Sequence, residues 1–406
     1  MHIVLTPFGS RGDVQPLLAL GTGLRAKGHE VTVGAAPNYR TWVEESGFRF
    51  REIGGDLEPW LKRQDTRNPF SLLAALARYV REEVPLCFRH TCDAVQDADL
   101  VVTTTHIAAH SAAEAARVPC RTVLYTAQFL PSRFHPPLAI PYQSLPGWLN
   151  RVLWWILDRL FDLLFKGPVN RERVKLGLAP IAGFLSYSRG ASSIIASDRD
   201  FAPIPPDVPP GPLQTGAMTL PASGKLEPSI EAFLQAGEPP VYIGFGSTPD
   251  RTAEETSRLI VDAVRISGRR AILCTEWAGL GGLEIPPEIL AIREVPHALL
   301  FPRVSAVVHH GGAGTTAAIA RAGVPQIIVP HLGDQFFHGK RVHDLGIGAA
   351  PIPRGELNAA RLAEAIHEVL ATPDIQARAR VFAERLRKTD GIAAATEVLL
   401  ARSSPI

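Results

Sequence analysis

Two histidines and three glycines stand between a β-branched run and an alanine-rich segment in residues 307–330, VVHHGGAGTTAAIARAGVPQIIVP. This order indicates a strand, a glycine turn and the start of a helix, which together present backbone N–H groups to an anion. His310 could donate a hydrogen bond to one phosphate and the Thr315 hydroxyl to the other. We expect a diphosphate against the N–H groups of Gly312, Gly314 and Thr315, although structural turns use the same glycines.

A carboxylate and an amide stand side by side in the stretch PHLGDQFFHG, after another apolar run. Asp334 and Gln335 could accept from and donate to neighbouring hydroxyls of a sugar ring. The alternative is that Asp334 only caps the following helix. In GFGST, residues 244–248, a second strand runs into a glycine turn, and its Gly246 and Ser247 suit the same diphosphate from the other side.

A third glycine loop, FGSRGDVQP, follows the first predicted strand and carries Asp13 at or just before a helix start. Its carboxylate could accept the proton of an attacking hydroxyl. The alternative is that Asp13 is an N-cap and nothing more. The three loops together predict a site for a phosphorylated sugar and a hydroxyl acceptor.

The elements that must position these loops alternate between short β-branched runs and helical patterns, which is typical of βαβ units and parallel sheets. The sequence predicts an α/β protein with two Rossmann-like domains that face each other across a cleft. Stretches rich in proline and glycine, which interrupt helices and strands, separate the two domains, for example PIPPDVPPGP and GEPP. We expect an N-terminal domain at residues 1–218, a linker at 219–238 and a C-terminal domain at 239–385. Residues 386–406 are expected to form a helix that packs back toward the N-terminal domain.

The composition of the chain argues against some partners and favours one cellular compartment. The chain has 406 residues and a net charge of +2, and it lacks the basic blocks that nucleic-acid binders need, so nucleic acid is not expected as a partner. Its four cysteines form no C-x-x-C pair, which favours free thiols in a reducing compartment. Neither a signal peptide nor a transmembrane segment is recognisable. We therefore expect a cytoplasmic protein, at most peripheral to a membrane.

One segment, PGWLNRVLWWILDRLFDLLFKG, breaks the alternation and predicts an amphipathic helix across residues 148–166. Its charged residues recur at helical spacing and leave a broad apolar surface. That surface either packs on its own domain or lines a pocket, or it faces a membrane.

The motifs HHGGAGT, AGVPQIIVP, GDQFF and RVHDLGIG, in this order, together with GSRGDVQPLLALGTGLRAKGHEVT near the N-terminus, resemble those of the family 1 glycosyltransferases of GT-B fold. The form of the signature looks closest to bacterial sterol and natural-product glucosyltransferases. The resemblance implies metal-independent, inverting transfer of a hexose, most simply glucose from UDP-glucose, to a hydroxyl of an apolar acceptor such as a sterol, triterpenoid or polyketide.

The resemblance also implies a role for each matching position. Asp13 would be the general base, and Asp334 with Gln335 would hold the donor hexose. The remaining positions would line or bind the nucleoside diphosphate: Ser10, Gly12, Gly246, Ser247, His310, Gly312, Gly314 and Thr315 at the diphosphate, and Val295 and His297 near the base. No metal site and no cofactor beyond the nucleotide sugar are implied.

Two departures leave the donor open. Plant relatives place a glutamate on the ribose hydroxyls where this chain has Ala318, and the usual tryptophan near the base is replaced by Glu294. Both dTDP-sugars and UDP-sugars are therefore candidate donors. The alternatives are a dTDP-deoxysugar or rhamnosyl transferase for an antibiotic aglycone or hydroxy-lipid, and a sugar-nucleotide-binding module without catalysis. An NAD enzyme is disfavoured because no strand leads into G-x-G-x-x-G with an acidic residue downstream.

Overall fold

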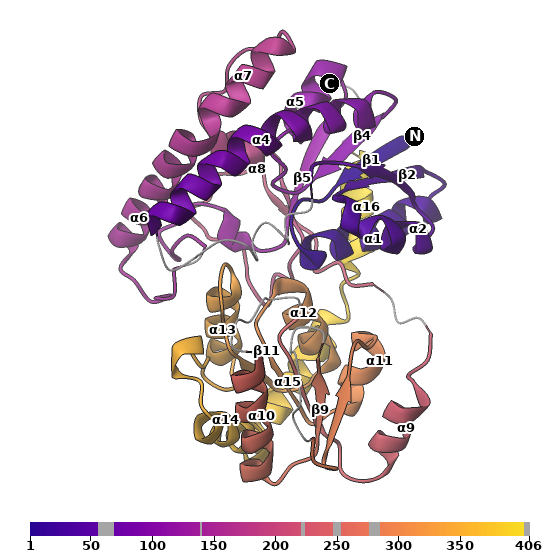
Figure 1. Cartoon of the computed structure of the whole chain (residues 1–406), viewed down its shortest axis with the longest axis vertical. Coiled ribbons are helices and arrows are strands. Elements are labelled where there is room, and N and C mark those ends of the chain that lie inside the picture. The colour runs from indigo at the N-terminus through magenta and orange to yellow at the C-terminus, as the bar shows by residue number, and fades with distance from the viewer. Residues whose placement is uncertain (56–68, 139, 221–223, 247–252, 276–284, 402–406) are drawn as a thin grey trace.

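The computed structural model describes residues 1–55, 69–138, 140–220, 224–246, 253–275 and 285–401. Figure 1 shows two lobes, one above the other, each with a sheet at its centre and helices around it. All the strand pairs within both sheets are parallel, and each sheet is covered by helices, so the fold is an α/β fold with two sheets of seven and five strands. The prediction of an α/β protein with two facing Rossmann-like domains is confirmed.

The N-terminal sheet has the strand order β3-β2-β1-β4-β5-β6-β7. The strand order changes direction between β1 and β4. In such sheets, ligands bind at the carboxyl ends of the strands around this switch point. The central strands are almost wholly apolar because helices cover both faces. The strands are β1 (His2–Thr6), β2 (Glu30–Ala35), β3 (Arg49–Glu52), β4 (Leu100–Thr103), β5 (Cys120–Leu124), β6 (Ile194–Ile195) and β7 (Leu213–Gln214).

The helices of this lobe include α1, which runs directly from the loop after β1 and buries an apolar face on the sheet. The α-helices are α1 (Arg11–Ala26), α2 (Arg40–Glu45), α4 (Pro69–Val95), α5 (Ala109–Ala116), α6 (Gly147–Phe161), α7 (Gly167–Lys175) and α8 (Phe184–Arg189). Short turns of other helix types are η1 (Pro37–Tyr39), η2 (Ala127–Phe129) and η3 (Asp162–Lys166), the last a π-helix that joins α6 to α7.

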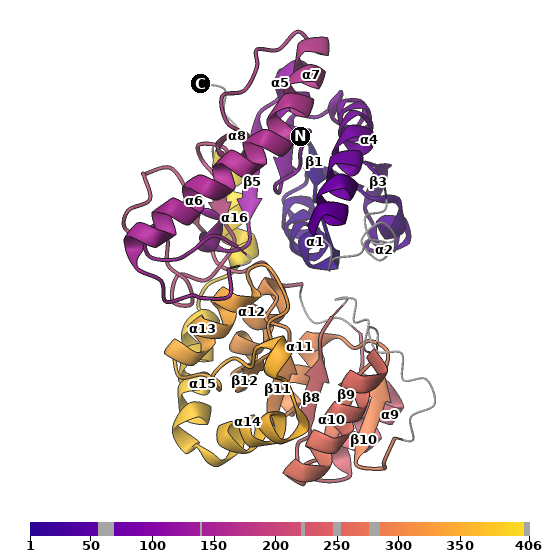
Figure 2. The same cartoon turned by 60° about the vertical axis from the view of Figure 1, so that its left-hand side comes forward.

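The C-terminal sheet has the order β10-β9-β8-β11-β12, so β8 lies in its middle and β11 directly beside it. The chain after β11 leads to the side of this lobe that lies next to the other lobe (Figure 2). Its strands are β8 (Val241–Gly244), β9 (Ala271–Cys274), β10 (Ile289–Ile292), β11 (Ala306–His309) and β12 (Gln326–Ile328). The helices are α9 (Pro228–Gln235), α10 (Ala253–Ser267), α11 (His297–Leu300), η4 (Phe301–Arg303), α12 (Ala313–Ala322), α13 (Gln335–Asp344), η5 (Arg354–Glu356), α14 (Ala359–Ala371), α15 (Pro373–Leu386) and α16 (Gly391–Ala401).

The segment expected to be a linker contains a helix. In α9, Ile230 and Leu234 are buried in the same cluster as Tyr242 and Ile272 of the C-terminal sheet. Proline at the first turn of α9 suits a helix start, and its apolar spacing gives it a face to bury. We therefore propose that residues 219–238 combine a connection with an element of the C-terminal core.

The last helix crosses back to the first lobe. Ala395 and Leu399 of α16 belong to the apolar cluster that α1 and the N-terminal sheet form. Figure 1 and Figure 2 both show α16, drawn in yellow, inside the upper lobe. We propose that the N-terminal domain of residues 1–218 is completed by this helix, while residues 239–385 form the second domain.

Helix α6 packs one face and exposes the other. Asn150 and Trp154 are buried, whereas Trp148 and Trp155 are exposed. Among the described residues, no helix is both long and apolar enough to cross a membrane.

Candidate active site

Asp13 lies in the first turn of α1, at the carboxyl end of β1. The backbone N–H of Ser10 donates to Asp13 Oδ2 (2.7 Å), and the Ser10 hydroxyl donates to the same oxygen (3.1 Å). The turn requires Gly9, whose φ is +130° and whose place leaves no room for a Cβ, since that atom would lie 2.3 Å from Oδ2. Ser10 is therefore the N-cap residue of α1, and Asp13, the third residue of the helix, closes a capping box with it, so Asp13 is not the N-cap that one reading of the sequence predicted. Both bonds use only one carboxylate oxygen.

The electrostatic setting of Asp13 favours a proton acceptor near neutral pH. Burial raises its pKa to about 6, although the hydrogen bonds from Ser10 oppose the shift, and the negative charge of Asp334 adds to it. That last effect places the carboxylates of Asp13 and Asp334, from different lobes, within electrostatic reach of each other. The cleft therefore brings the predicted base to the residues predicted to hold a sugar.

His310 follows β11 and lies between two glycines. A Cβ on Gly312 would lie 2.4 Å from His310 Nε2, and one on Gly246 would lie 3.0 Å from His310 Cε1. Burial lowers the pKa of His310 to about 3, and the nearby His331 and His297 lower it further. The ring is therefore neutral at pH 7 and carries one N–H. Its Nδ1 has no hydrogen-bond partner in the described part of the chain.

The N-terminus of α12 is open. Gly312 is its N-cap residue, with φ −60° and ψ 144°, and no side chain of the described residues caps it. The first N–H groups of a helix have no partner within the helix. Thr315, half-buried, and Gly314, exposed, stand in this first turn. α1 and α12 are in contact across the cleft, so this candidate anion site lies near the helix that carries Asp13.

Asp334 and Gln335 begin α13. Asp334 occupies the N-cap position but makes no side-chain capping bond, so the alternative of a mere cap is not what the structure shows. Burial raises the pKa of Asp334, and His338 opposes this shift. The side-chain oxygen of Gln335, Oε1, accepts hydrogen bonds from the backbone N–H groups of His331 (2.7 Å) and Leu332 (3.0 Å). Gln335 can therefore offer a sugar only the N–H groups of its side-chain amide.

The segment expected near the nucleotide base contains an ion pair between the lobes. His297 begins α11 and stacks on Phe301 at 4.4 Å, and burial lowers its pKa to about 4, with the charge of Arg11 adding to the shift. Arg11 at the start of α1 lies 3.6 Å from Glu294 of the other lobe. Val295 is half-buried beside them. Of the remaining predicted positions, Ser10 and Gly12 are exposed on α1, and Ser247 lies outside the described residues.

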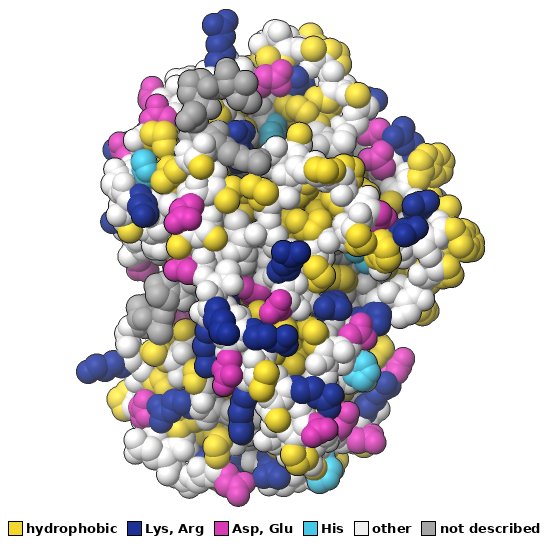
Figure 3. Space-filling model, turned by 180° about the vertical axis from the view of Figure 1, so that it is seen from behind, with side chains coloured by type: hydrophobic (Ala, Val, Ile, Leu, Met, Phe, Trp, Pro, Cys, Tyr) yellow, Lys and Arg dark blue, Asp and Glu magenta, His cyan; other side chains and the backbone are white. Residues whose placement is uncertain are grey.

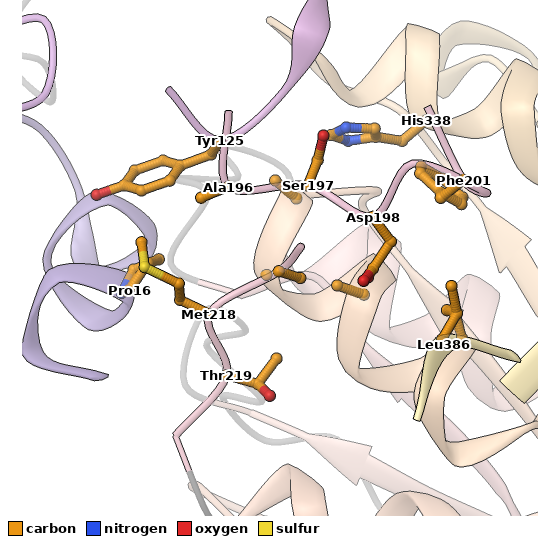
Figure 4. Close-up of a pocket in the computed structure, with 15 residues that line it drawn as sticks. Pro16, Tyr125, Ala196, Ser197, Asp198, Phe201, Met218, Thr219, His338 and Leu386 are labelled. Atoms are coloured by element: carbon orange, nitrogen blue, oxygen red, sulfur yellow. The ribbon is translucent and has the colours of Figure 1, made fainter. Parts of the chain in front are cut away.

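Two pockets border this cleft. One lies where the lobes join, and Figure 4 shows Pro16 and Tyr125 on one side of it and Phe201 and Leu386 on the other. The second lies at the carboxyl ends of the N-terminal strands, beside Asp13, and is mostly apolar. Its lining is formed by Pro7, Phe8, Gly9, Val14, Ala35, Ala36, Tyr39, Ile53 and Gly55.

Three residues at the site were not predicted from the sequence. Tyr125 donates from its hydroxyl to the backbone carbonyl of Asp13 (2.5 Å). His338 Nδ1 donates to the carbonyl of Gly311 (2.7 Å) and so fixes the turn before α12. Figure 4 shows the Ser197 side chain pointing toward the His338 ring. His338 stands one helical turn after Asp334, a spacing that could have identified it, whereas the Tyr125 contact joins segments far apart in the sequence.

No group of three or more His, Cys, Asp or Glu side chains within the described ranges could hold a metal ion. The candidate anion site is formed by a helix N-terminus and a neutral histidine. These groups lie opposite a carboxylate with a raised pKa and beside an apolar pocket. That combination is suited to holding a phosphorylated leaving group while a hydroxyl is deprotonated.

Comparison with known proteins assigns the family. Residues 3–131 match the glycosyltransferase family 28 N-terminal domain, and residues 260–394 match the erythromycin biosynthesis protein CIII-like C-terminal domain. The vancomycin aglycone glucosyltransferase of Amycolatopsis orientalis is 35% identical over 409 residues, which cover 98% of this chain and 97% of that protein. The sterol 3-beta-glucosyltransferase UGT80B1 of Arabidopsis thaliana is 33% identical over 423 residues, covering 98% and 67%.

The crystal structure of the glycosyltransferase VinC in complex with dTDP matches the fold with a TM-score of 0.74 at 21% identity, covering 99% of both chains. Sequence similarity along the whole chain and this shared architecture agree with the cleft described above. The chain therefore belongs to the GT-B-fold glycosyltransferases and is related to bacterial antibiotic glycosyltransferases and to sterol glucosyltransferases.

Proposed function

We propose that the protein transfers a hexose from a nucleoside diphosphate sugar to a hydroxyl of an apolar small molecule, with inversion at the anomeric carbon. The observation that carries this proposal is the meeting of Asp13 with the open N-terminus of α12 and with Asp334 in one cleft. A base, an anion site and a partner for sugar hydroxyls are the three parts that such a displacement needs.

In this reaction the acceptor oxygen forms a bond to the anomeric carbon while the bond from that carbon to the diphosphate oxygen breaks. The electron pair leaves with the diphosphate, and the hydroxyl proton passes to Asp13. Even at a pKa of about 6 the carboxylate cannot deprotonate an alcohol beforehand, so the proton moves late, as the new bond forms. Base catalysis of this kind contributes about 10² to 10⁴ in rate.

Negative charge grows on the diphosphate as it leaves. The N–H groups at the start of α12 and the N–H of His310 would stabilise that charge, with the helix dipole adding about 0.3 to 1 kcal/mol. These groups perform the task that a divalent cation performs at many diphosphate sites. We therefore propose that transfer proceeds without added metal.

For the donor we propose UDP-glucose first. The relative from Amycolatopsis orientalis is named a vancomycin aglycone glucosyltransferase, and the plant relative a sterol 3-beta-glucosyltransferase, so glucose is the sugar that both names share. One observation favours dTDP-sugars as the second candidate. Ala318 carries no group that could recognise a ribose 2′-hydroxyl, so this position offers no reason to prefer ribose over deoxyribose.

For the acceptor we propose a flat, apolar molecule such as a sterol, triterpenoid or polyketide aglycone. The pocket beside Asp13 supports this class, since Phe8, Ala36 and Ile53 line it. We also propose that the protein works in the cytoplasm, because Cys87, Cys92, Cys120 and Cys274 are free thiols, as a reducing compartment maintains them.

The test is a turnover screen of the purified protein with EDTA present. UDP-glucose and dTDP-glucose are each combined with sterols, triterpenoids, phenols and hydroxy fatty acids, and products are detected by mass spectrometry. We expect a hexose mass increment on one apolar class, and a β-linkage by NMR when the donor is an α-glucoside. An α-linked product would contradict inversion. If EDTA alone abolished transfer, the metal-independent mechanism would be wrong.

A further inference from the structure

Helix α6 and the π-helix after it expose an apolar stripe, which consists of Trp148, Val152, Trp155, Ile156, Leu160 and Leu163. These residues are spaced by about one helical turn, so they form one continuous outward face. Trp148 is 69% exposed, Trp155 64% and Leu163 80%. Figure 3 shows hydrophobic side chains gathered along the edge of the upper lobe where α6 lies, with Lys and Arg side chains among them.

The stripe cannot turn inward, because the opposite face of α6 is already fixed. Trp154 donates its indole N–H to the carbonyl of His135 (3.2 Å), and Asn150 donates to the carbonyl of Arg133 (2.9 Å). Farther along, the rings of Phe161, Phe165 and Phe184 stack within 4.9 to 6.2 Å of one another. Two exposed tryptophans on a rigid helix indicate a surface that meets an apolar or interfacial environment.

The charges beside the stripe are predominantly positive. Each acidic residue of the segment from α6 to α7 has a local basic partner, because Arg159 pairs with Asp158 and Asp162, and Lys175 pairs with Glu172. In the described part of the chain, three further cations of the segment have no acidic partner, namely Arg151, Lys166 and Arg171. The segment therefore presents an excess of positive charge beside its apolar face.

This combination fits the surface of a bilayer that contains anionic lipid. Tryptophan rings favour the level of the headgroups, and each Lys or Arg near an anionic surface adds to the attraction. An amphipathic helix lying in the plane of the interface buries only its outer face, which is the face that α6 leaves open. A second copy of the chain would have to place this net positive surface against itself.

The stripe is also connected to the proposed acceptor pocket. Phe161 and Phe165 belong to the same apolar cluster as Phe8, which lines that pocket next to Asp13. A membrane on the outer face of α6 would thus lie on the acceptor lobe and leave the donor lobe in water. The link to the acceptor rests on the proposed function, whereas the docking itself does not.

We propose that α6 docks the protein on the surface of a membrane rich in anionic lipid, with the stripe in the headgroup region and the neighbouring cations on the lipid phosphates. The full-length protein would be tested by flotation with vesicles of phosphatidylcholine alone and of phosphatidylcholine mixed with phosphatidylglycerol. Vesicle binding needs neither donor nor acceptor, so its outcome is independent of sugar transfer.

We expect binding to the anionic vesicles at least about tenfold tighter than to the neutral ones, with a loss of this preference at high salt. The double variant Trp148→Ser, Trp155→Ser should abolish binding to both kinds of vesicle. The variant Arg151→Glu, Arg171→Glu should abolish only the preference for anionic lipid. The control is Ile266→Ser, Val381→Ser, which removes two apolar side chains, 63% and 56% exposed, from helices of the other lobe and should bind as the parent does.

Three results would overturn the proposal. The first is no flotation of the parent protein with either vesicle, and the second is an equal loss of binding in the control variant. The third is a dimer in light scattering that the change of Trp148 and Trp155 converts to a monomer, which would show that a second copy covers the stripe. Unchanged thermal unfolding of each variant confirms that its fold is intact.

Discussion

At the scale of single residues, Asp13 has a structural task, and we propose a chemical one as well. Its Oδ2 accepts both hydrogen bonds from Ser10, and this fixes the carboxylate at the cleft while Oδ1 is left for a substrate. Burial of the carboxylate raises its pKa to about 6, against the effect of these hydrogen bonds. A base with that pKa is ionised at neutral pH yet a better proton acceptor than an ordinary aspartate.

This pKa predicts a pH dependence. Asp13 must be unprotonated to accept a proton, so kcat/KM should fall about tenfold for each pH unit below about 6. The variant Asp334→Asn removes a negative charge that raises the pKa of Asp13. The fall of kcat/KM at low pH should therefore begin at a lower pH in this variant than in the parent protein. Asp344→Asn is the control, because Asp344 ends the same helix and pairs with Lys340 on the surface. An unchanged pH dependence of kcat/KM in Asp334→Asn would contradict the coupling of the two carboxylates.

A second prediction concerns His310. Because burial lowers its pKa to about 3, we expect it to bind the diphosphate as a neutral donor and not as a cation. His310→Ala should weaken binding of UDP or dTDP by about tenfold, the value of one hydrogen bond to a charged group. Calorimetric titration of the parent protein and of the variant with each nucleotide at pH 8 measures this difference. If His310→Ala bound both nucleotides as tightly as the parent, the ring would have no part in the anion site.

At the scale of elements, the first turn of α12 offers a matched pair of substitutions. A Cβ at position 312 would collide with His310 Nε2, whereas one at position 314 meets no described atom within 4 Å. Gly312→Ala should therefore displace His310 and weaken nucleotide binding as much as His310→Ala does. Gly314→Ala should leave the His310 ring in place and bind more tightly than Gly312→Ala. Equal affinities for the two variants, in the same calorimetric titration, would contradict this account of the turn.

Much of this architecture was predictable from the sequence at the level of elements, because buried parallel strands and glycine turns leave strong local patterns. The strand-to-helix turns at residues 309–315 and before Asp13 are examples. The sequence did not predict the helix α9 in the expected linker, since prolines dominate that stretch. It also could not decide which way the apolar surface of α6 faces, because periodicity predicts two faces and only the packing of Trp154 selects the buried one.

The same limit applies to the site. The position of residues in short motifs, such as His310 and Asp334, near the cleft was predictable because the glycine turn or helix start that places each of them is part of the same motif. Their roles there stay predictions. The contacts of Tyr125 with Asp13 and of Arg11 with Glu294 join segments more than a hundred residues apart. No local pattern encodes such contacts, since they depend on how distant segments pack, within one lobe for Tyr125 and Asp13 and between the lobes for Arg11 and Glu294.

At the scale of the whole molecule, Arg321 ties the lobes together behind the cleft. It donates to Asp198 Oδ1 (2.6 Å) in the N-terminal lobe and to the carbonyls of Leu386 (2.8 Å) and Thr389 (3.1 Å), where the chain crosses back toward that lobe. Both charged side chains are largely buried, with 16% and 5% exposed. The relative placement of Asp13 and α12 therefore depends on this ion pair.

Asp198→Ala should consequently destabilise the protein by about 3 to 5 kcal/mol, because it leaves a buried guanidinium without its carboxylate. Asp200→Ala is the matched control at the same junction, since Asp200 pairs with Arg385 on the surface at 4.0 Å and such pairs contribute about 0 to 1 kcal/mol. Urea unfolding of the two variants measures the difference. Equal stabilities would mean that Arg321 does not hold the lobes together.

The most direct test of the account is Asp13→Asn, assayed with the donor and acceptor that the turnover screen identifies. The amide oxygen can still accept the bonds from Ser10, so the helix cap and the diphosphate site should persist, but the amide cannot take up the proton. We predict that kcat falls by about 10² to 10⁴ while the dissociation constant for the nucleoside diphosphate is unchanged. Turnover of Asp13→Asn at the parent rate would contradict the role of Asp13 as the base and with it the mechanism proposed for the cleft.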